Sequence, residues 1–313
     1  MYPKSELSRQ NSSYRLFVIP FVVFTVGIML RGFGSNDDNA ANRILEKVIS
    51  TYQSMPTYKA TGIVTSEMDF GKGNRESATE FSIMLQKPNK YLIHWTEVNS
   101  GKKEMRPSGA VWSNGIQAYL YMGPMNTYSK IMTDETAISS ATKISKGVAS
   151  TVPMLFLTVF EKYPNRFFKL NNLKIEKTEI IDNEECYVIS GTSITSNKVL
   201  YWISKSRYLI LKYYRSIERP VGGFSRSEST EEELEKGLVA LGLKPSVENK
   251  NKMRDMMKRT SDRLDKTKIK GFSTEIHHDI SSPELTKEDF DYILPTGATL
   301  DNSMFERALN RQN

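Results

Sequence analysis

The amino-acid sequence predicts an α+β fold, in which an incomplete antiparallel β-barrel, or strongly curved sheet, wraps around covering helices. Apolar and polar residues alternate in many short segments, and short turns join these segments in succession. Helical patterns interrupt the alternation at residues 133–163 and 230–268. In one domain of this size, consecutive antiparallel strands favour an open barrel with an apolar concave face that helices partly fill.

The first 34 residues direct the chain to a membrane. Met1–Arg15 is polar and basic, Leu16–Leu30 is a run of 15 residues without a charge, and Gly32 and Gly34 follow it. As a helix this run spans about 22 Å, less than the ~30 Å hydrocarbon core of a bilayer. Residues 1–34 are therefore either a cleaved signal peptide or an uncleaved anchor. Both alternatives predict an exported protein, periplasmic or membrane-anchored, with its body outside the cytoplasm.

The first predicted element of the body is a helix from about Asn39 to Met55, which Pro56 ends, because apolar residues recur there at spacings of three and four. From Thr57 the period changes to two, which predicts a meander of strands joined by hairpin turns. These strands are expected at residues 57–70, 78–87, 91–96, 110–113, 117–122 and 126–131.

Helices are expected next. Residues 133–149 predict a mostly polar helix, and residues 151–163 are apolar nearly all round, which predicts a buried or cavity-covering helix. Thr230–Glu233 has the capping-box pattern of a further helix. A basic helix with a narrow methionine stripe is expected at residues 246–268. The remaining strands are predicted at residues 174–181, 185–192, 198–204, 208–216 and 272–280.

Composition excludes several classes of function. The 313 residues include one cysteine, so an intramolecular disulfide is impossible, and three histidines leave little material for a zinc site. The net charge of +7 is concentrated in residues 244–270, which hold ten Lys or Arg and four Asp or Glu. Because the basic residues of an exported chain lie on one stretch, we expect no nucleic-acid partner. Without a Gly-rich phosphate loop, Gly-x-Ser-x-Gly or His-Glu-x-x-His, we expect no cofactor and no enzymatic activity.

Three chemically distinctive features have structural interpretations. His277 and His278 are neighbours on a predicted strand, so they point to opposite faces and cannot easily share a metal. Cys186 is interpreted as a small buried strand residue. The basic helix has two interpretations: it meets anionic lipid head groups or an acidic partner, or it is a solvated helix that packs its methionine stripe on the barrel. The thinness of the apolar stripe favours the second.

The order of elements, together with segments such as Ala41–Tyr52, Gln86–Ile93, Cys186–Gly191 and Leu294–Ala298, resembles the LolA-like superfamily of periplasmic lipoprotein carriers and outer-membrane lipoprotein-sorting-like proteins. The resemblance implies one half-barrel domain over residues 40–313, with a basic helical insertion at about 225–270. It also implies an apolar cavity that holds acyl chains or another hydrophobic ligand.

Candidate cavity residues are the large apolar and aromatic side chains of the predicted strands. The residues assigned to the cavity are Ile83, Leu85, Ile93, Trp95, Tyr119, Tyr121, Val199, Tyr201 and Tyr208. An ordinary filled core shows the same alternation, so that alternative stays open. Tyrosine hydroxyls suit a ligand that is apolar with a polar end.

Two functions follow from this reasoning. The first is binding or transport of a hydrophobic ligand, a lipid or the acyl chains of a lipoprotein, in the bacterial cell envelope. The second is a membrane-tethered envelope sensor or protein-interaction module on the same fold, with its interior filled by its own side chains. The expected partners are a lipid or an acylated protein, and the membrane through the N-terminal segment. The sequence makes no prediction of oligomeric state.

Overall fold

The computed structural model describes residues 36–71, 73–98, 107–148, 150–161, 169–193, 196–222, 229–303 and 306. The predicted signal peptide or anchor, residues 1–34, lies outside this part of the chain. None of the helices within it combines the length and the apolarity that crossing a membrane requires.

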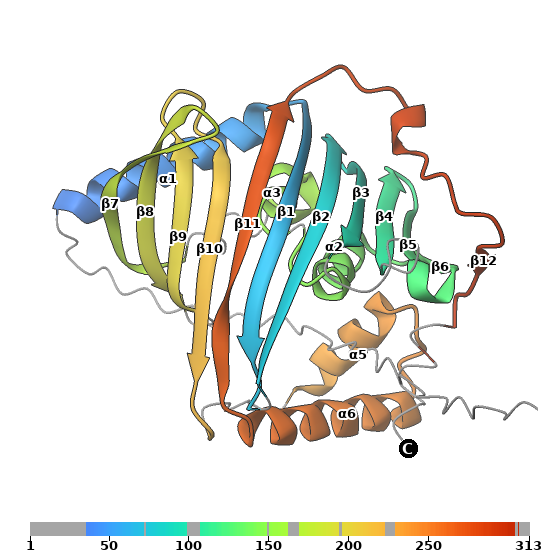
Figure 1. The fold of residues 1–313 in the computed structure, drawn as a ribbon. Coiled ribbons are helices and arrows are strands. Elements are labelled where there is room, and N and C mark those ends of the chain that lie inside the picture. The colour runs from blue at the N-terminus through green and yellow to red at the C-terminus, as the bar shows by residue number, and fades with distance from the viewer. Residues whose placement is uncertain are drawn as a thin grey trace, which may run out of the picture.

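The described residues form one twelve-stranded sheet that does not close (Figure 1). Its strand order is β12-β6-β5-β4-β3-β2-β1-β11-β10-β9-β8-β7, and all neighbours are antiparallel except β12 and β6. The strands are β1 (Thr57–Asp69), β2 (Asn74–Gln86), β3 (Lys90–Glu97), β4 (Ser108–Asn114), β5 (Ala118–Met122), β6 (Thr127–Ile131), β7 (Asn171–Ile181), β8 (Glu184–Ser193), β9 (Ser196–Ser204), β10 (Ile210–Arg219), β11 (Ile269–Ser281) and β12 (Thr299–Leu300). The predicted fold class, an unclosed and curved sheet with covering helices, is confirmed.

Helices cover one face of the sheet, here called the inner face (Figure 1). They are α1 (Asn36–Ser54), α2 (Asp134–Ile144), α3 (Val152–Phe156) and the 3-10 helix η3 (Thr158–Phe160). The hydroxyl of Thr133 accepts a hydrogen bond from the backbone N–H of Thr136 and caps α2. Alternation decides which side chains face these helices: Tyr91, Ile93 and Trp95 of β3 are buried in the inner core.

The single helix expected at residues 151–163 is wrong. Leu157 is extended, with φ −78° and ψ 135°, and it separates α3 from η3. Two hydrogen bonds account for the break, because the backbone N–H groups of Thr158 and Val159 bind Pro88 O and the Asn89 side chain instead of continuing the helix. The sheet turn between β2 and β3 therefore holds this part of the cover.

Between β10 and β11 the chain forms a helical hairpin of α5 (Glu231–Ala240) and α6 (Val247–Asp265). Thr230 and Glu233 make the predicted capping box of α5. The interpretation from sequence, in which the methionine stripe of α6 packs on the barrel, is wrong. The stripe packs against α5 instead. The cluster comprises Leu234, Leu238, Met253, Met256 and Met257.

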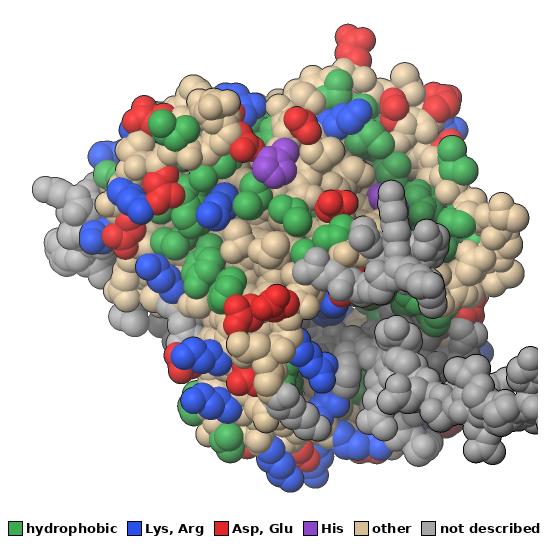
Figure 2. All heavy atoms as spheres, viewed as in Figure 1, with side chains coloured by type: hydrophobic (Ala, Val, Ile, Leu, Met, Phe, Trp, Pro, Cys, Tyr) green, Lys and Arg blue, Asp and Glu red, His purple; other side chains and the backbone are tan. Residues whose placement is uncertain are grey.

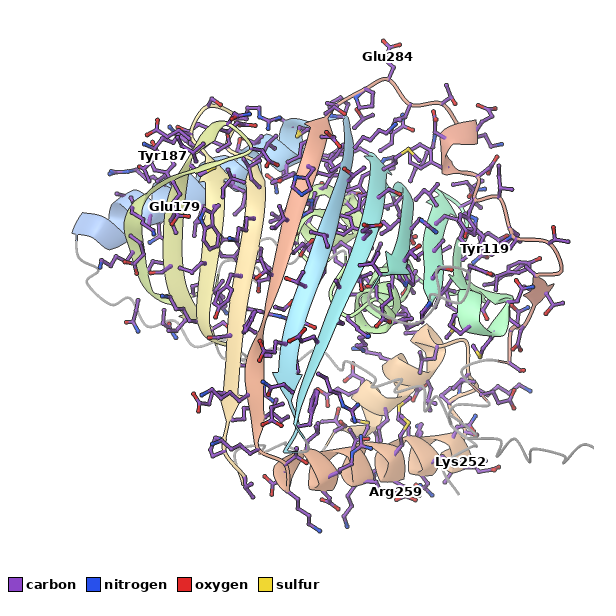
Figure 3. The ribbon with its side chains drawn as sticks, viewed as in Figure 1. Tyr119, Glu179, Tyr187, Lys252, Arg259 and Glu284 are labelled. Carbon is purple, nitrogen blue, oxygen red and sulfur yellow. The ribbon has the colours of Figure 1, made fainter. Side chains whose placement is uncertain are left out.

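The charge of the basic helix is largely offset by its partner in the hairpin. Lys250 forms ion pairs with Glu231 and Glu235, and Arg254 pairs with Glu231. Lys and Arg side chains line the lower edge of the molecule in Figure 2, with Asp and Glu among them, and Figure 3 labels Lys252 and Arg259 on the same helix. The hairpin is therefore not a uniformly basic surface.

Candidate functional site

The inner face carries a large apolar core, to which seven of the nine predicted cavity residues contribute. Six of them are at most 3% exposed, and Tyr208 packs against the core while half-buried. The six are Ile83, Leu85, Ile93, Trp95, Val199 and Tyr201. The structure thus brings together residues from β2, β3, β9 and the β9–β10 connection, and side chains of the chain itself fill the space between them.

Tyr119 and Tyr121 lie on the opposite, outer face. In β5 the inner positions are taken by Ala118, Leu120 and Met122, so the two tyrosines point away from the helices. They belong to an outer aromatic cluster, in which the C-terminal segment covers the sheet (Figure 3 labels Tyr119). The cluster comprises Ala110, Trp112, Tyr121 and the partly buried Leu92, Tyr119, Tyr128, Tyr292, Leu294 and Ala298. The nine predicted residues therefore do not share one face.

Two glycines make room for the large rings of the inner face. A Cβ on Gly109 of β4 would lie 2.3 Å from the Trp95 ring, and one on Gly62 of β1 would lie 2.3 Å from the Phe81 ring. Each ring therefore lies against the glycine of a neighbouring strand, a close approach that only glycine permits. These pairs fix the aromatic surface of the inner face.

A buried polar network interrupts this apolar surface. Glu275 and His277 of β11 are each 1% exposed and face inward. Glu275 accepts hydrogen bonds from Ser150 Oγ at 2.6 Å and from Thr151 Oγ1 at 2.9 Å, and it lies 3.1 Å from His277 Nε2. His277 Nδ1 lies 3.1 Å from the hydroxyl of Tyr58. An apolar surround makes a carboxylate costly to bury, so these partners are what keep it stable there.

Sequence reasoning missed this network. The alternation of β11 was recognised, but it did not show that the polar residues Ser273, Glu275 and His277 would face the core while Phe272 is 37% exposed. The sequence does carry one signal, since Ser273, Glu275 and His277 share one side of the strand. If that side faces the core, these polar side chains need hydrogen-bonding partners there. Those partners, Ser150 and Thr151, are more than 120 residues away in sequence.

Thr151, His277 and Glu275 are also the residue types of a hydrolytic triad. Thr151 Oγ1 lies 3.3 Å from His277 Nε2. The three side chains are 0–1% exposed, so none of them meets a substrate in this conformation. The arrangement acts here as a structural anchor.

The segment that supplies Ser150 and Thr151 is called the covering segment, residues 133–161, and comprises α2, α3 and η3. In the described part of this segment, side-chain bonds to the sheet include Asp134 to the Tyr91 hydroxyl, Lys146 to Glu97, Ser150 and Thr151 to Glu275, and Thr158 to Asn89. Among the described residues, one backbone hydrogen bond joins it to the sheet strands and their turns, from Thr158 N to Pro88 O. The covering segment is therefore attached to the sheet without being part of it.

Burial changes the ionisation of the inner tyrosines. Desolvation raises the pKa of Tyr58 and of Tyr201 well above the usual value. Desolvation, together with the nearby Asp134 carboxylate, also raises the pKa of Tyr91. These hydroxyls are neutral across the physiological range and act as hydrogen-bonding groups.

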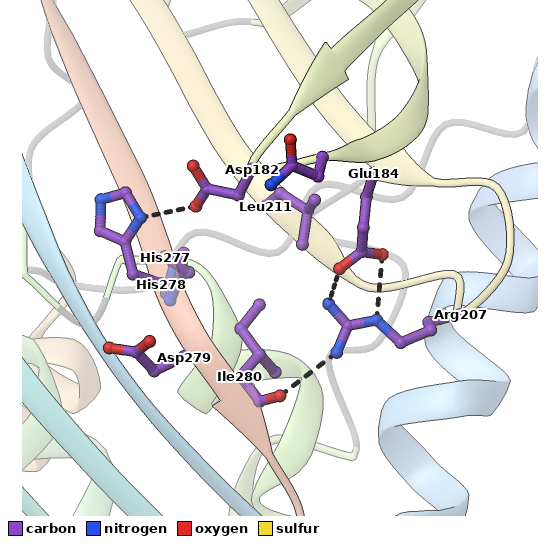
Figure 4. A pocket seen from close by; sticks show the side chains of 9 residues that line it. Asp182, Glu184, Arg207, Leu211, His277, His278, Asp279 and Ile280 are labelled. Carbon is purple, nitrogen blue, oxygen red and sulfur yellow. Dashed lines mark hydrogen bonds and ion pairs between the residues drawn. The ribbon is translucent and has the colours of Figure 1, made fainter.

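A polar cleft of about 620 Å³ opens at the end of the sheet beside the buried network (Figure 4). It is lined by Asp182, Asn183, Glu184, Arg207, Leu211, His277, His278, Asp279 and Ile280. The β10–β11 pairing extends along β11 only to Ile276, and Asp279 is in the left-handed region at φ +53° beside an irregularity in the β1–β11 pairing. The sheet is thus locally open at this point.

Most charges of the cleft are paired with one another. Arg207 binds both carboxylate oxygens of Glu184 and donates to Ile280 O at 3.2 Å. Burial raises the pKa of Glu184, but the hydrogen bonds from Arg207 and Ser204 outweigh it, and the net pKa is lowered. His278 Nδ1 lies 2.6 Å from Asp182. Asp182 and Asp279 carry the remaining carboxylates, and no group of metal-binding side chains is found among the described residues.

Solved structures with a related arrangement come from several bacteria. An uncharacterized conserved protein from Thermus thermophilus aligns with 9% identity and a TM-score of 0.38, over 84% of this chain and 98% of that one. A LolA superfamily protein from Nitrosomonas europaea aligns with 12% identity and a TM-score of 0.28, over 80% and 97%. An outer membrane lipoprotein-sorting protein domain from Vibrio parahaemolyticus aligns with 11% identity and a TM-score of 0.31, over 80% and 97%. At this similarity the matches assign no function.

No curated protein matches the chain. A family model described as "Predicted periplasmic protein (DUF2092)" matches residues 41–222, more than half of the chain. This description agrees with the location outside the cytoplasm that the N-terminal sequence predicts. The chain belongs to the DUF2092 family of predicted periplasmic proteins.

Proposed function

We propose that the protein binds a hydrophobic ligand, a lipid or the acyl chains of a lipoprotein, between the inner face and the covering segment. The observation that carries the proposal is the attachment of the covering segment, which closes a continuous apolar surface almost entirely through side-chain bonds. Such bonds break one at a time, whereas a strand of the sheet would have to leave a whole hydrogen-bond ladder. Displacing the segment uncovers the apolar inner face.

The free energy that displacing the covering segment costs is similar to the free energy that a bound acyl chain supplies. The covering segment buries Val152, Leu155, Phe156, Leu157 and Phe160 in the core. Exposing five such side chains costs about 8–15 kcal/mol. An acyl chain of about 16 carbons that takes their place recovers about 13 kcal/mol, at roughly 0.8 kcal/mol per methylene group. A ligand with one or two long chains therefore compensates for the displacement.

A second candidate function is an interaction module or sensor whose interior stays filled. The near-complete burial of the six inner residues supports it, because the core needs no ligand to be well packed. A partner protein would then bind elsewhere on the sheet, and the covering segment would stay in place.

Native mass spectrometry of the full-length protein, purified without denaturation, distinguishes the two candidates. Binding of a hydrophobic ligand predicts a co-purifying mass in the range of a lipid, which organic extraction releases. An interaction module predicts a bare mass and no binding when long-chain lipids are added. The second result, in a stably folded protein, would contradict the proposal.

A matched pair of substitutions tests the location of the ligand. Trp95 of β3 and Tyr121 of β5 are 3% and 4% exposed and lie on opposite faces of the sheet. Trp95→Ala is expected to change lipid affinity at least tenfold, because it alters the inner surface. Tyr121→Ala removes a similarly buried ring from the outer face and should leave affinity unchanged. If the two substitutions changed lipid affinity equally, the ligand would not bind at the inner face.

A further inference from the structure

We infer that the polar end of the ligand is a hydrogen-bond donor, cationic in preference to anionic, and that Glu275 receives it. The inference rests on the proposed function and specifies the class of ligand. It assigns Glu275 as a specificity-determining residue on the inner face.

The hydroxyl donors around Glu275 come from the covering segment. The two hydroxyl donors to Glu275, Ser150 Oγ and Thr151 Oγ1, both belong to the covering segment, while His277 is on its own strand. When the covering segment is displaced, Glu275 loses both hydroxyls. A carboxylate that remains in an apolar site with His277 as its one remaining partner of the three is destabilised. A ligand that supplies donors in their place therefore binds more tightly than one that supplies none.

The cleft beside Glu275 is lined by more carboxylates than guanidinium groups. The strand that carries Glu275 and His277 continues into the lining of the cleft through His278, Asp279 and Ile280, so the cleft lies beside the buried network. The cleft contributes the carboxylates of Asp182, Glu184 and Asp279, against the guanidinium of Arg207. That guanidinium is already bound to Glu184 and to a backbone oxygen (Figure 4).

Both sites consequently disfavour a negative head group. A fatty-acid carboxylate placed at Glu275 would bring two negative charges together in a poorly solvated site. An ammonium group there makes charge-assisted hydrogen bonds of the kind that Ser150 and Thr151 make as neutral donors. A hydroxyl head group is intermediate, because it donates without charge.

The test uses three probes of equal chain length on the full-length protein: hexadecylamine, hexadecanol and palmitate. Their affinities are measured by displacement of an apolar fluorescent dye. Wild-type protein is expected to bind the amine roughly tenfold or more tighter than palmitate, as expected for a charge-assisted hydrogen bond. Hexadecanol should lie between them.

Glu275→Gln keeps an oxygen that accepts hydrogen bonds but removes the charge, so it should abolish the preference for the amine. Glu284→Gln is the matched control, because Glu284 is exposed and projects away from the body at the far end of the sheet from α6 (Figure 3). If Glu275→Gln does not fold, Ser150→Ala provides the second test. It removes a donor that Glu275 uses only while the covering segment is closed, so the affinities for hexadecylamine and palmitate should both rise at least threefold and the preference for the amine should remain. Unchanged affinities for both probes would contradict the replacement of Ser150 by the ligand at Glu275.

The outcomes separate the inference from the proposed function. If all three probes displace the dye equally, or if palmitate binds best, the inference is wrong and the proposed function stands. An amine preference that persists in Glu275→Gln also overturns the inference. If no probe displaces the dye from any variant, the proposed function itself fails.

Discussion

A segment on the inner face and a segment on the outer face both cover the sheet, and they are attached to it in different ways. The covering segment lies on the inner face and is held by side-chain bonds to Tyr91, Glu97, Asn89 and Glu275. On the outer face lies the C-terminal cover, residues 282–301.

The C-terminal cover is integrated into the sheet. Its strand β12 pairs with β6, and the backbone N–H of Asp301 donates to Tyr128 O at 2.8 Å. The ring of Tyr292 packs against Trp112 and Tyr121, with centroids 5.1 and 5.7 Å apart. An acyl chain has no backbone groups with which to replace these ladder bonds.

We expect the covering segment, rather than the C-terminal cover, to open. A side-chain hydrogen bond can be exchanged for a similar hydrogen bond from a ligand. The covering segment is held by such bonds around Glu275. Both covers bury apolar side chains, but the C-terminal cover is also joined to the sheet by strand pairing, which is lost only when the fold itself is disrupted. We therefore expect substitutions on the outer face to change stability and those on the inner face to change ligand binding.

The largest effect is expected at Trp112. This residue is 8% exposed and contacts Tyr119, Tyr128 and Tyr292. Trp112→Ala should lower the free energy of unfolding by about 3–5 kcal/mol, because it leaves a cavity under the C-terminal cover. Urea denaturation measures this, and the affinity for a long-chain lipid should not change. A change in affinity without loss of stability would contradict the comparison.

A smaller effect is expected at the inner anchor. Thr151→Val keeps the shape of the side chain but removes one donor to Glu275, so the free energy of unfolding should fall by about 1–3 kcal/mol. The association rate of an apolar dye, followed by stopped-flow fluorescence, should rise because the covering segment opens more often. Thr142→Val is the control, since its hydroxyl donates to Ile138 O within α2. Equal rates in the two variants would remove the anchoring role.

The smallest effect concerns the alkaline stability of the outer cluster. Desolvation, together with Tyr121, raises the pKa of Tyr292 to about 12, while an unfolded tyrosine ionises near pH 10. Its contribution is therefore complete below pH 10 and is lost as the pH rises from 10 to 12. Tyr292→Phe should show a shallower loss of urea stability over this window than wild type. If the stabilities of wild type and Tyr292→Phe fell in parallel from pH 10 to 12, the alkaline loss of stability would not come from Tyr292.

The sequence predicted what depends on local period and missed what depends on distant partners. Alternation placed Ile93 and Trp95 together, because neighbours two apart on a strand share a face. The same alternation misplaced Tyr119 and Tyr121. Aromatic residues at alternate positions indicate a buried face, but when both faces of a sheet are covered they do not show which face it is. The C-terminal cover buries them through Tyr292, about 170 residues later in the chain.

The buried network and β12 were missed for similar reasons. A carboxylate on a strand is normally solvated, and only the hydroxyls of Ser150 and Thr151 make Glu275 a core residue. Strand β12 is two residues long, too short to produce a period. Pairing across the whole fold, rather than a pattern within it, determines both features.

Hydrogen exchange of the full-length protein, with and without a saturating long-chain ligand, tests most directly whether the inner cover is the part that opens. We predict that exchange changes in the covering segment, at residues 133–161, while the C-terminal cover at residues 282–301 exchanges as before. No change in the covering segment, or equal changes in the two covers, would contradict the account.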